Sequence, residues 1–148
     1  MVKFYLTKNP SRTKKLGESF TEKIFENGPQ KRAIVLGLIG ELGGGKTTFL
    51  QGFARGLGIK QKILSPTFII MKKFLISNSQ LLNFYHIDCY RIEKPKEILD
   101  LGFKEIISNP RNIVAIEWAN KIRKIMPKDI TILEFKFIDK STRKIVVK

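Results

Sequence analysis

A glycine-rich segment carries the residue types and the spacing of a phosphate-binding loop. Its residues, Gly40-Glu41-Leu42-Gly43-Gly44-Gly45-Lys46-Thr47, match the pattern G-x-x-x-x-G-K-[ST] between an apolar run and a helical pattern. Glycines let several backbone N–H groups converge on one phosphate, because they adopt dihedral angles that other residues rarely adopt. A helix that begins near Lys46 adds its dipole, the Lys46 ammonium reaches the β- and γ-phosphates, and the Thr47 hydroxyl offers an oxygen to magnesium. The segment therefore predicts a nucleotide site rather than a glycine-rich turn without a ligand.

Nucleotide hydrolysis also needs a carboxylate that holds magnesium or orients water at the same sheet edge as the loop. Glu117 ends the apolar run Ile113-Val114-Ala115-Ile116, so we expect it at the C-terminal edge of the sheet, where ligands bind. Asp88 follows Phe84-Tyr85-His86-Ile87 and is the second candidate. The alternatives are a surface strand end for Glu117 and a turn or helix cap for Asp88.

Other chemically distinctive residues have two interpretations each. The segment Ser65-Pro66-Thr67-Phe68 lies between the expected helix after the loop and the next strand. Phosphate-loop hydrolases often keep a mobile segment there that senses the γ-phosphate, so Thr67 is a candidate contact, with a plain turn into the strand as the alternative. Trp118 follows Glu117, and its spacing favours core packing over ligand stacking. His86 and Cys89 have no second ligand or base nearby in the sequence, so we expect neither a metal site nor a nucleophile there.

The elements that must position these residues follow from hydrophobic periodicity and turn residues. Strands are predicted over residues 2–6, 33–39, 68–74, 81–87, 112–116, 130–138 and 145–147, and helices over 11–27 and 46–57, with short helices from Pro95 and through Ile122. Alternation over 130–138 predicts that Leu133, Phe135 and Phe137 share one buried face, and the last two strands are expected to form an antiparallel hairpin at a sheet edge. The order predicts a single domain over 1–148, a three-layer α/β fold with a mostly parallel sheet and antiparallel hairpins.

Composition and hydropathy indicate the cellular location of this protein and the kinds of partner that its charge favours. The 148 residues include 28 Lys and Arg against 13 Asp and Glu, a net charge of +15, and one cysteine. No apolar stretch approaches the ~18 residues of a membrane span, and the N-terminus has no signal-peptide core, so we expect a cytoplasmic protein without membrane contact. The positive charge has two explanations, a surface for polyphosphate or RNA and the codon bias of an AT-rich genome.

Taken together, the motifs resemble those of the TsaE family, bacterial P-loop ATPases required for threonylcarbamoyladenosine (t6A) modification of transfer RNA. The resemblance extends over nearly the whole chain. It rests on Thr13-Lys14-Lys15-Leu16-Gly17, the loop from Gly40 to Thr48, Ser65-Pro66-Thr67-Phe68, His86-Ile87-Asp88-Cys89-Tyr90-Arg91, Leu101-Gly102 and Glu117-Trp118. The chain departs from the family pattern at Gly44, where alanine is more frequent, and at Asn120, where glutamate is frequent.

The resemblance implies a P-loop NTPase-like fold, ATP or ADP with Mg2+ as cofactors, and catalytic roles for Lys46, Asp88 and Glu117. It implies that Thr47 and Glu117 hold the metal and that Asp88 binds it directly or through a water. The implied nucleotide contacts are Thr13, Gly40, Glu41, Leu42, Gly43, Gly44, Gly45, Lys46, Thr47, Thr48, Thr67 and Arg143. The implied partners are the TsaD and TsaB subunits, which carry out the transferase chemistry, and contact with the tRNA itself stays open.

Two other function classes remain to be compared. A small P-loop nucleotide or metabolite kinase would share the loop but needs an arginine-bearing lid, for which Arg123 is the only candidate after Glu117 and before the C-terminal hairpin. A basic nucleic-acid-binding module would need a recognition helix or exposed aromatic residues, and neither signature is evident in the sequence.

Overall fold

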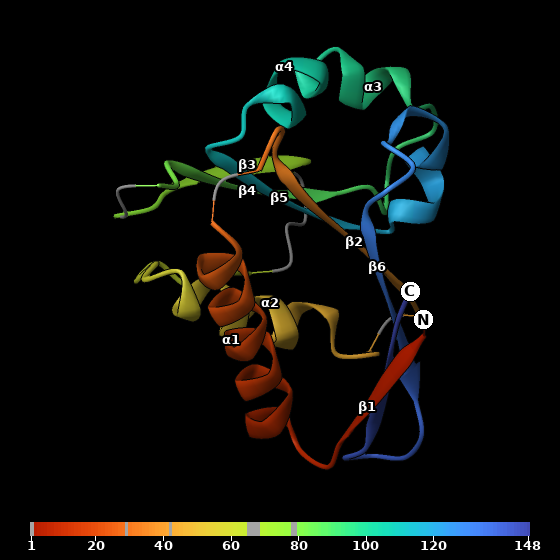
Figure 1. Ribbon diagram of the computed structural model, residues 1–148. Coiled ribbons are helices and arrows are strands. Elements are labelled where there is room, and N and C mark those ends of the chain that lie inside the picture. Colours follow the sequence, from red (N-terminus) through yellow and green to blue (C-terminus); the bar gives the residue numbers. More distant parts are fainter. Residues whose placement is uncertain (1, 29, 42, 65–68, 78–79) are drawn as a thin grey trace.

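The computed structural model describes residues 2–28, 30–41, 43–64, 69–77 and 80–148 (Figure 1). Its strands are β1 (Lys3–Thr7), β2 (Ile34–Gly40), β3 (Met71–Leu75), β4 (Asn83–Asp88), β5 (Asn112–Glu117), β6 (Thr131–Phe137) and β7 (Arg143–Val147). Its helices are α1 (Pro10–Asn27), α2 (Lys46–Gly56), α3 (Lys96–Leu99), α4 (Phe103–Ser108) and the 3-10 helix η1 (Ala119–Ile125).

The described strands form one seven-stranded sheet in the order β1-β7-β6-β2-β5-β4-β3. The four central strands, β6, β2, β5 and β4, run parallel, and the antiparallel strands β3, β7 and β1 extend the sheet on its two sides. Strand β2 is the apolar run before the glycine-rich loop, and it lies between β5 and β6 because its side chains can be covered on both faces. The mostly parallel α/β sheet with antiparallel additions is therefore confirmed.

Helices cover both faces of this sheet and produce two separate cores. Helices α1 and α2 cover one face, where the core includes Phe49, Phe53 and Phe84 (Figure 1). The other core lies under α3, α4 and η1 and includes Ile98, Phe103 and further apolar residues of β4 and β5. This arrangement of helix, sheet and helix layers confirms the predicted three-layer architecture.

Three glycines allow α1 and α2 to pack at close range. A Cβ atom built on Gly52 would lie 1.9 Å from the carbonyl oxygen of Lys14, and one on Gly17 would lie 2.2 Å from the carbonyl oxygen of Phe49. A Cβ on Gly56 would meet the Thr21 hydroxyl at 2.3 Å. Any side chain at these positions would force the helices apart, so these glycines fix where α2 sits relative to α1.

The structure differs from the sequence expectations in three places. The C-terminal hairpin is not at the edge, because β1 pairs with β7 and takes the edge position itself. Phe137 is 56% exposed rather than buried, because it is the last residue of β6 and lies beyond the core. Its ring contacts the Arg143 guanidinium, whose carbon lies 4.6 Å from the ring centroid. Helix α4 was not predicted, because its six residues offer less than two turns of apolar pattern.

Among the described helices, none combines the length and the apolar character that crossing a bilayer requires.

Candidate functional site

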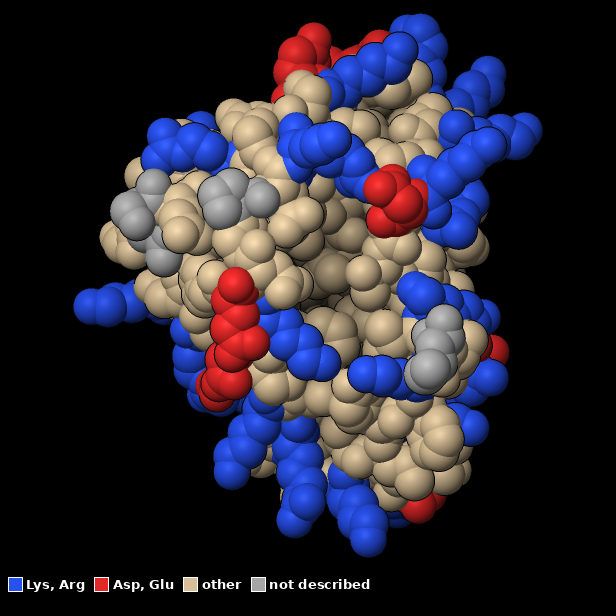
Figure 2. Space-filling view, viewed as in Figure 1, with Lys and Arg blue, Asp and Glu red and all other residues tan. Residues whose placement is uncertain are grey.

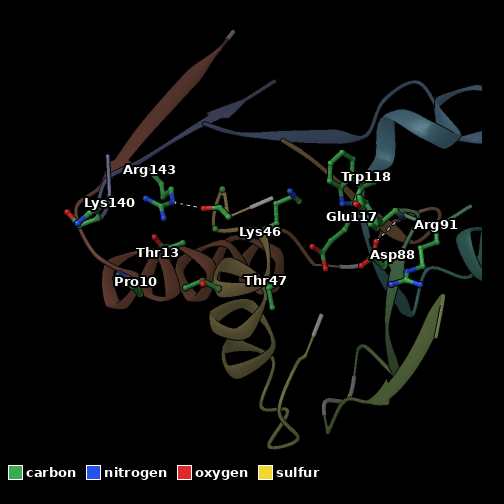
Figure 3. Close-up of a pocket in the computed structure, with 16 residues that line it drawn as sticks. Pro10, Thr13, Lys46, Thr47, Asp88, Arg91, Glu117, Trp118, Lys140 and Arg143 are labelled. Carbon is green, nitrogen blue, oxygen red and sulfur yellow. Dashed lines mark hydrogen bonds between the residues drawn. The ribbon is translucent and has the colours of Figure 1, made fainter. Parts of the chain in front are cut away.

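The glycine-rich loop connects the end of β2 to the start of α2 and lines a pocket of about 520 Å3 (Figure 3). Gly43 and Gly45 have φ angles of 79° and 97°, a region that favours glycine. Gly45 is the N-cap of α2 and no side chain caps the helix there, so the first N–H groups of α2 are left for a ligand. The local sequence thus produces an anion site at the C-terminal edge of the sheet.

Lys46 lies at the centre of this pocket and is buried (Figure 3). Its ammonium donates hydrogen bonds to the carbonyl oxygens of Gly40 at 2.6 Å and Glu41 at 2.9 Å. Burial lowers the pKa of Lys46, and the negative charges of Glu117 and Asp88 oppose that shift. The carbonyl groups of Gly40 and Glu41 thus position the lysine side chain. Neither residue is among those that line the pocket.

Asp88 and Glu117 end the adjacent parallel strands β4 and β5 and are paired with each other in the sheet register. Both side chains are buried, and both line the pocket with Lys46 and Thr47. The register brings the two acids to one point at the edge of the sheet where the phosphate loop also lies. The alternative interpretation of Glu117 as a surface strand end is wrong, because Glu117 is only 3% exposed.

The Asp88 carboxylate both stabilises a turn and lines the pocket. Its Oδ1 accepts a hydrogen bond from the backbone N–H of Tyr90 at 2.9 Å, which is the turn contact considered as an alternative. The carboxylate nevertheless lines the pocket. Burial raises the pKa of Asp88, with the neighbouring charge of Glu117 adding to the rise, while the Tyr90 N–H, His86 and Lys46 oppose it. A cation bound between the two carboxylates would relieve this cost of burial.

His86 holds Glu117 through a buried hydrogen bond and does not itself line the pocket. It donates its Nε2–H to Glu117 Oε2 at 2.6 Å, and both side chains are almost fully buried. His86 belongs to β4 and stands opposite Ala115 of β5, two residues before Glu117. No pattern in the sequence connects these two residues, because only the strand register brings them together.

The opposite wall of the pocket comes from the two ends of the chain. Thr13 of α1 is buried and its hydroxyl is hydrogen-bonded to that of Thr7 at 2.7 Å. Arg143 of β7 donates its Nε–H to the carbonyl oxygen of Gly43 at 2.9 Å. A Cβ on Gly45 would lie within 4 Å of both side chains, so Thr13 and Arg143 border the phosphate loop.

Two aromatic residues, Tyr90 and Trp118, line the pocket, although the sequence pattern favoured a core position for Trp118. Trp118 lines the pocket, and the Lys46 ammonium lies 4.8 Å from the centroid of its ring. Its φ of 57° makes it the one non-glycine residue with positive φ among the described residues, a strained conformation typical of functional sites. The Tyr90 ring packs beside it with centroids 5.1 Å apart. Core packing alone therefore does not describe Trp118. Further residues that line the pocket are Pro10, Arg91, Lys140 and Ser141.

The donor groups fit a magnesium nucleotide. Within the described parts of the chain, no three His, Cys, Asp or Glu side chains gather as a metal cage. Mg2+ does not need one, because it is held by one or two carboxylates and by nucleotide phosphates. Asp88, Glu117 and the Thr47 hydroxyl provide hard oxygen donors beside a cationic loop for phosphate. Two candidate contacts, Leu42 and Thr67, lie outside the described residues.

Comparisons with known proteins agree with this geometry. The sequence profile described as "Threonylcarbamoyl adenosine biosynthesis protein TsaE" matches residues 7–145. The tRNA threonylcarbamoyladenosine biosynthesis protein TsaE of Bacillus subtilis is 40% identical over 126 residues, which cover 83% of this chain and 70% of that protein. The protein of the same name from Borreliella burgdorferi is 37% identical over 121 residues, covering 81% of this chain and 84% of the relative. The crystal structure of YdiB from Bacillus subtilis matches with a TM-score of 0.71 and 31% identity, covering 99% of this chain and 84% of YdiB.

Proposed function

This chain belongs to the TsaE family, and from that membership and the pocket we propose that it binds and hydrolyses ATP with Mg2+ in support of t6A modification of tRNA. The observation that carries the proposal is the meeting of the phosphate loop and two buried carboxylates at one sheet edge. A loop of this kind without acids would bind a phosphate, but it would have no group to hold the metal.

The phosphate loop supplies binding. Residues 43–48 line the pocket, no side chain caps the start of α2, and Lys46 lies beside this free helix end. We expect the Lys46 ammonium to exchange the carbonyl oxygens of Gly40 and Glu41 for phosphate oxygens. A charge-assisted hydrogen bond is worth ~1.5–3 kcal/mol, so Lys46→Ala is expected to weaken nucleotide binding at least tenfold.

The acids supply the metal site. Thr47, Asp88 and Glu117 would hold Mg2+, which when bound supplies positive charge to the phosphates of the nucleotide. His86 keeps the Glu117 carboxylate in place through its hydrogen bond. The Trp118 ring lies beside the Lys46 ammonium at the wall of the pocket and packs against Tyr90.

The family name does not assign the transfer reaction to this chain alone. In our proposal the TsaD and TsaB subunits carry out the transfer to tRNA in the cytoplasm, and turnover of ATP by this chain returns their complex to the active state. The whole chain, residues 1–148, would act as one domain in that assembly.

The test is reconstitution of t6A synthesis from purified TsaD, TsaB and this chain. We expect multiple turnovers only when the chain and ATP are present, and loss of turnover with Lys46→Ala or Glu117→Ala. Lys96→Ala and Glu105→Ala are matched controls, because both residues are exposed and neither lines the pocket. Full turnover by the pocket variants would contradict the proposal.

The kinase alternative finds no support in the pocket. Between Glu117 and the C-terminal hairpin lie η1 and a short connection, and Arg123 is exposed and does not line the pocket. A nucleoside monophosphate added with ATP and Mg2+ is therefore expected to accept no phosphate. Phosphoryl transfer to it would favour the kinase.

A further inference from the structure

A second hollow lies at the end of the sheet opposite to the nucleotide pocket. It is a groove of about 790 Å3 between the second half of α1, the starts of β1, β2 and β6, and the end of β7. It shares no lining residue with the nucleotide pocket. Figure 2 shows a hollow near the middle of the drawn face, with Lys and Arg side chains on several sides of it and a smaller number of Asp and Glu side chains nearby. The groove plays no part in the proposed hydrolysis.

The rim of the groove is strongly basic. Its cationic side chains are Lys3, Lys23, Lys31, Arg32 and Lys148, and its one acidic side chain among the described lining residues is Asp129. Asp129 is already ion-paired with Arg32. Lys148 has Glu134 at 3.6 Å. The described residues provide no carboxylate within ion-pair distance of the three exposed lysines, Lys3, Lys23 and Lys31, so part of the rim charge is not neutralised by the chain itself.

The floor of the groove is apolar. Phe20 and Ile24 of α1, Ile34 of β2 and Val147 of β7 line it, and each is only partly buried against the main core. At these side chains α1 does not fully cover the core, so part of their apolar surface faces the groove. An apolar floor within a cationic rim is complementary to a surface with apolar side chains in its centre and carboxylates around them.

Three other occupants fit less well. A second copy of this chain would bring another surface from a protein of net charge +15, and like charges would oppose contact. RNA bases need free ring faces for stacking, but the Phe20 ring is packed edge-to-face against Tyr5 and Phe49. A single small anion would need converging donors, whereas the exposed lysines of the rim stand on β1, on α1 and on the connection to β2.

We propose that this groove is a docking site for an acidic, amphipathic segment of a partner protein, which places apolar side chains on Phe20, Ile24 and Val147 and carboxylates against Lys3, Lys23 and Lys31. This docking site rests on the proposed function, because the partner proteins used to test it are the TsaD and TsaB subunits named there. It leaves the nucleotide pocket free to act while the partner is bound at the other end of the sheet.

The test measures binding of the TsaD–TsaB pair to the full chain at two ionic strengths. The double variant Lys23→Glu/Lys31→Glu reverses two exposed rim charges, and Lys104→Glu/Lys124→Glu changes the net charge equally at exposed positions outside the groove. We expect the rim variant to bind at least tenfold more weakly, and the wild type to lose affinity as salt rises. The control is expected to stay within about twofold of the wild type.

Each outcome decides a separate question. Equal binding by the rim variant and the wild type, or equal loss in both double variants, would overturn the groove proposal and leave the nucleotide function intact. No binding of the subunits by the wild type would overturn the proposed partnership together with the docking site. Binding of purified tRNA, or self-association of the chain, that the rim variant alone abolishes would assign the groove to RNA or to a second copy and would also overturn the proposal. Thermal stabilisation by Mg-ATP in all variants shows that they are folded.

Discussion

Removing the imidazole of His86 is the perturbation that most directly tests how the acids are positioned. His86→Ala leaves Glu117 Oε2 buried without its donor at 2.6 Å. A hydrogen bond to a charged group contributes ~1.5–3 kcal/mol, and the loss of such a partner behind a metal ligand costs about 10- to 100-fold in metal affinity or activity. We expect the Mg2+ concentration for half-maximal ATP hydrolysis to rise by about that factor, with binding of metal-free ATP nearly unchanged.

The assay is a Mg2+ titration of ATP hydrolysis, with the melting temperature measured in parallel. Asn83→Ala is the matched control, because Asn83 is buried on the same strand and donates to Asn112 Oδ1 at 3.1 Å, away from the pocket. It should lower stability without changing the Mg2+ requirement. His86→Gln keeps a donor and is expected to recover part of the loss. A wild-type Mg2+ requirement in His86→Ala, or the same rise in Asn83→Ala, would refute the role of His86.

Three further outcomes follow from burial and packing. Because burial raises the pKa of Asp88, the folded state binds a proton more tightly than the unfolded state, so the stability of the nucleotide-free protein falls as pH rises from the ordinary pKa of ~3.9 to the raised value. Asp88→Asn should abolish this dependence and raise the melting temperature at pH 7 while it lowers hydrolysis, and an unchanged melting temperature would contradict the assignment. Gly52→Ala gains ~1 kcal/mol in helix propensity. It also places a Cβ 1.9 Å from the Lys14 carbonyl oxygen, an overlap with backbone that we expect to cost ~3 kcal/mol, so urea unfolding should show a net loss of ~2 kcal/mol. Wild-type stability of this variant would refute the close packing. Burial raises the pKa of Cys89 to about 12, so a thiol reagent should label it only after unfolding, and rapid labelling of the native protein would oppose this.

Local pattern was sufficient for the parts of this protein that depend on neighbours in the chain. The loop from Gly40 to Thr47 is recognised by its spacing, since glycine conformation and a helix start are local properties. The apolar run before Glu117 predicted a buried strand that ends at the ligand edge, and β5 has this place. The layers and the parallel core of the sheet followed from the order of such elements.

Strand register and packing decided what the chain order does not contain. His86 meets Glu117 across β4 and β5, and Thr13 and Arg143 reach the loop from opposite ends of the chain. The positive φ of Trp118 turns its ring to Lys46, which no spacing rule predicts. The basic groove also arises from residues that are distant in the sequence. The sequence alone determines which elements form and where the phosphate loop stands, because these depend on local backbone preferences and hydrophobic periodicity. The side-chain partners depend on long-range contacts between strands and helices, and therefore only the tertiary structure decides them.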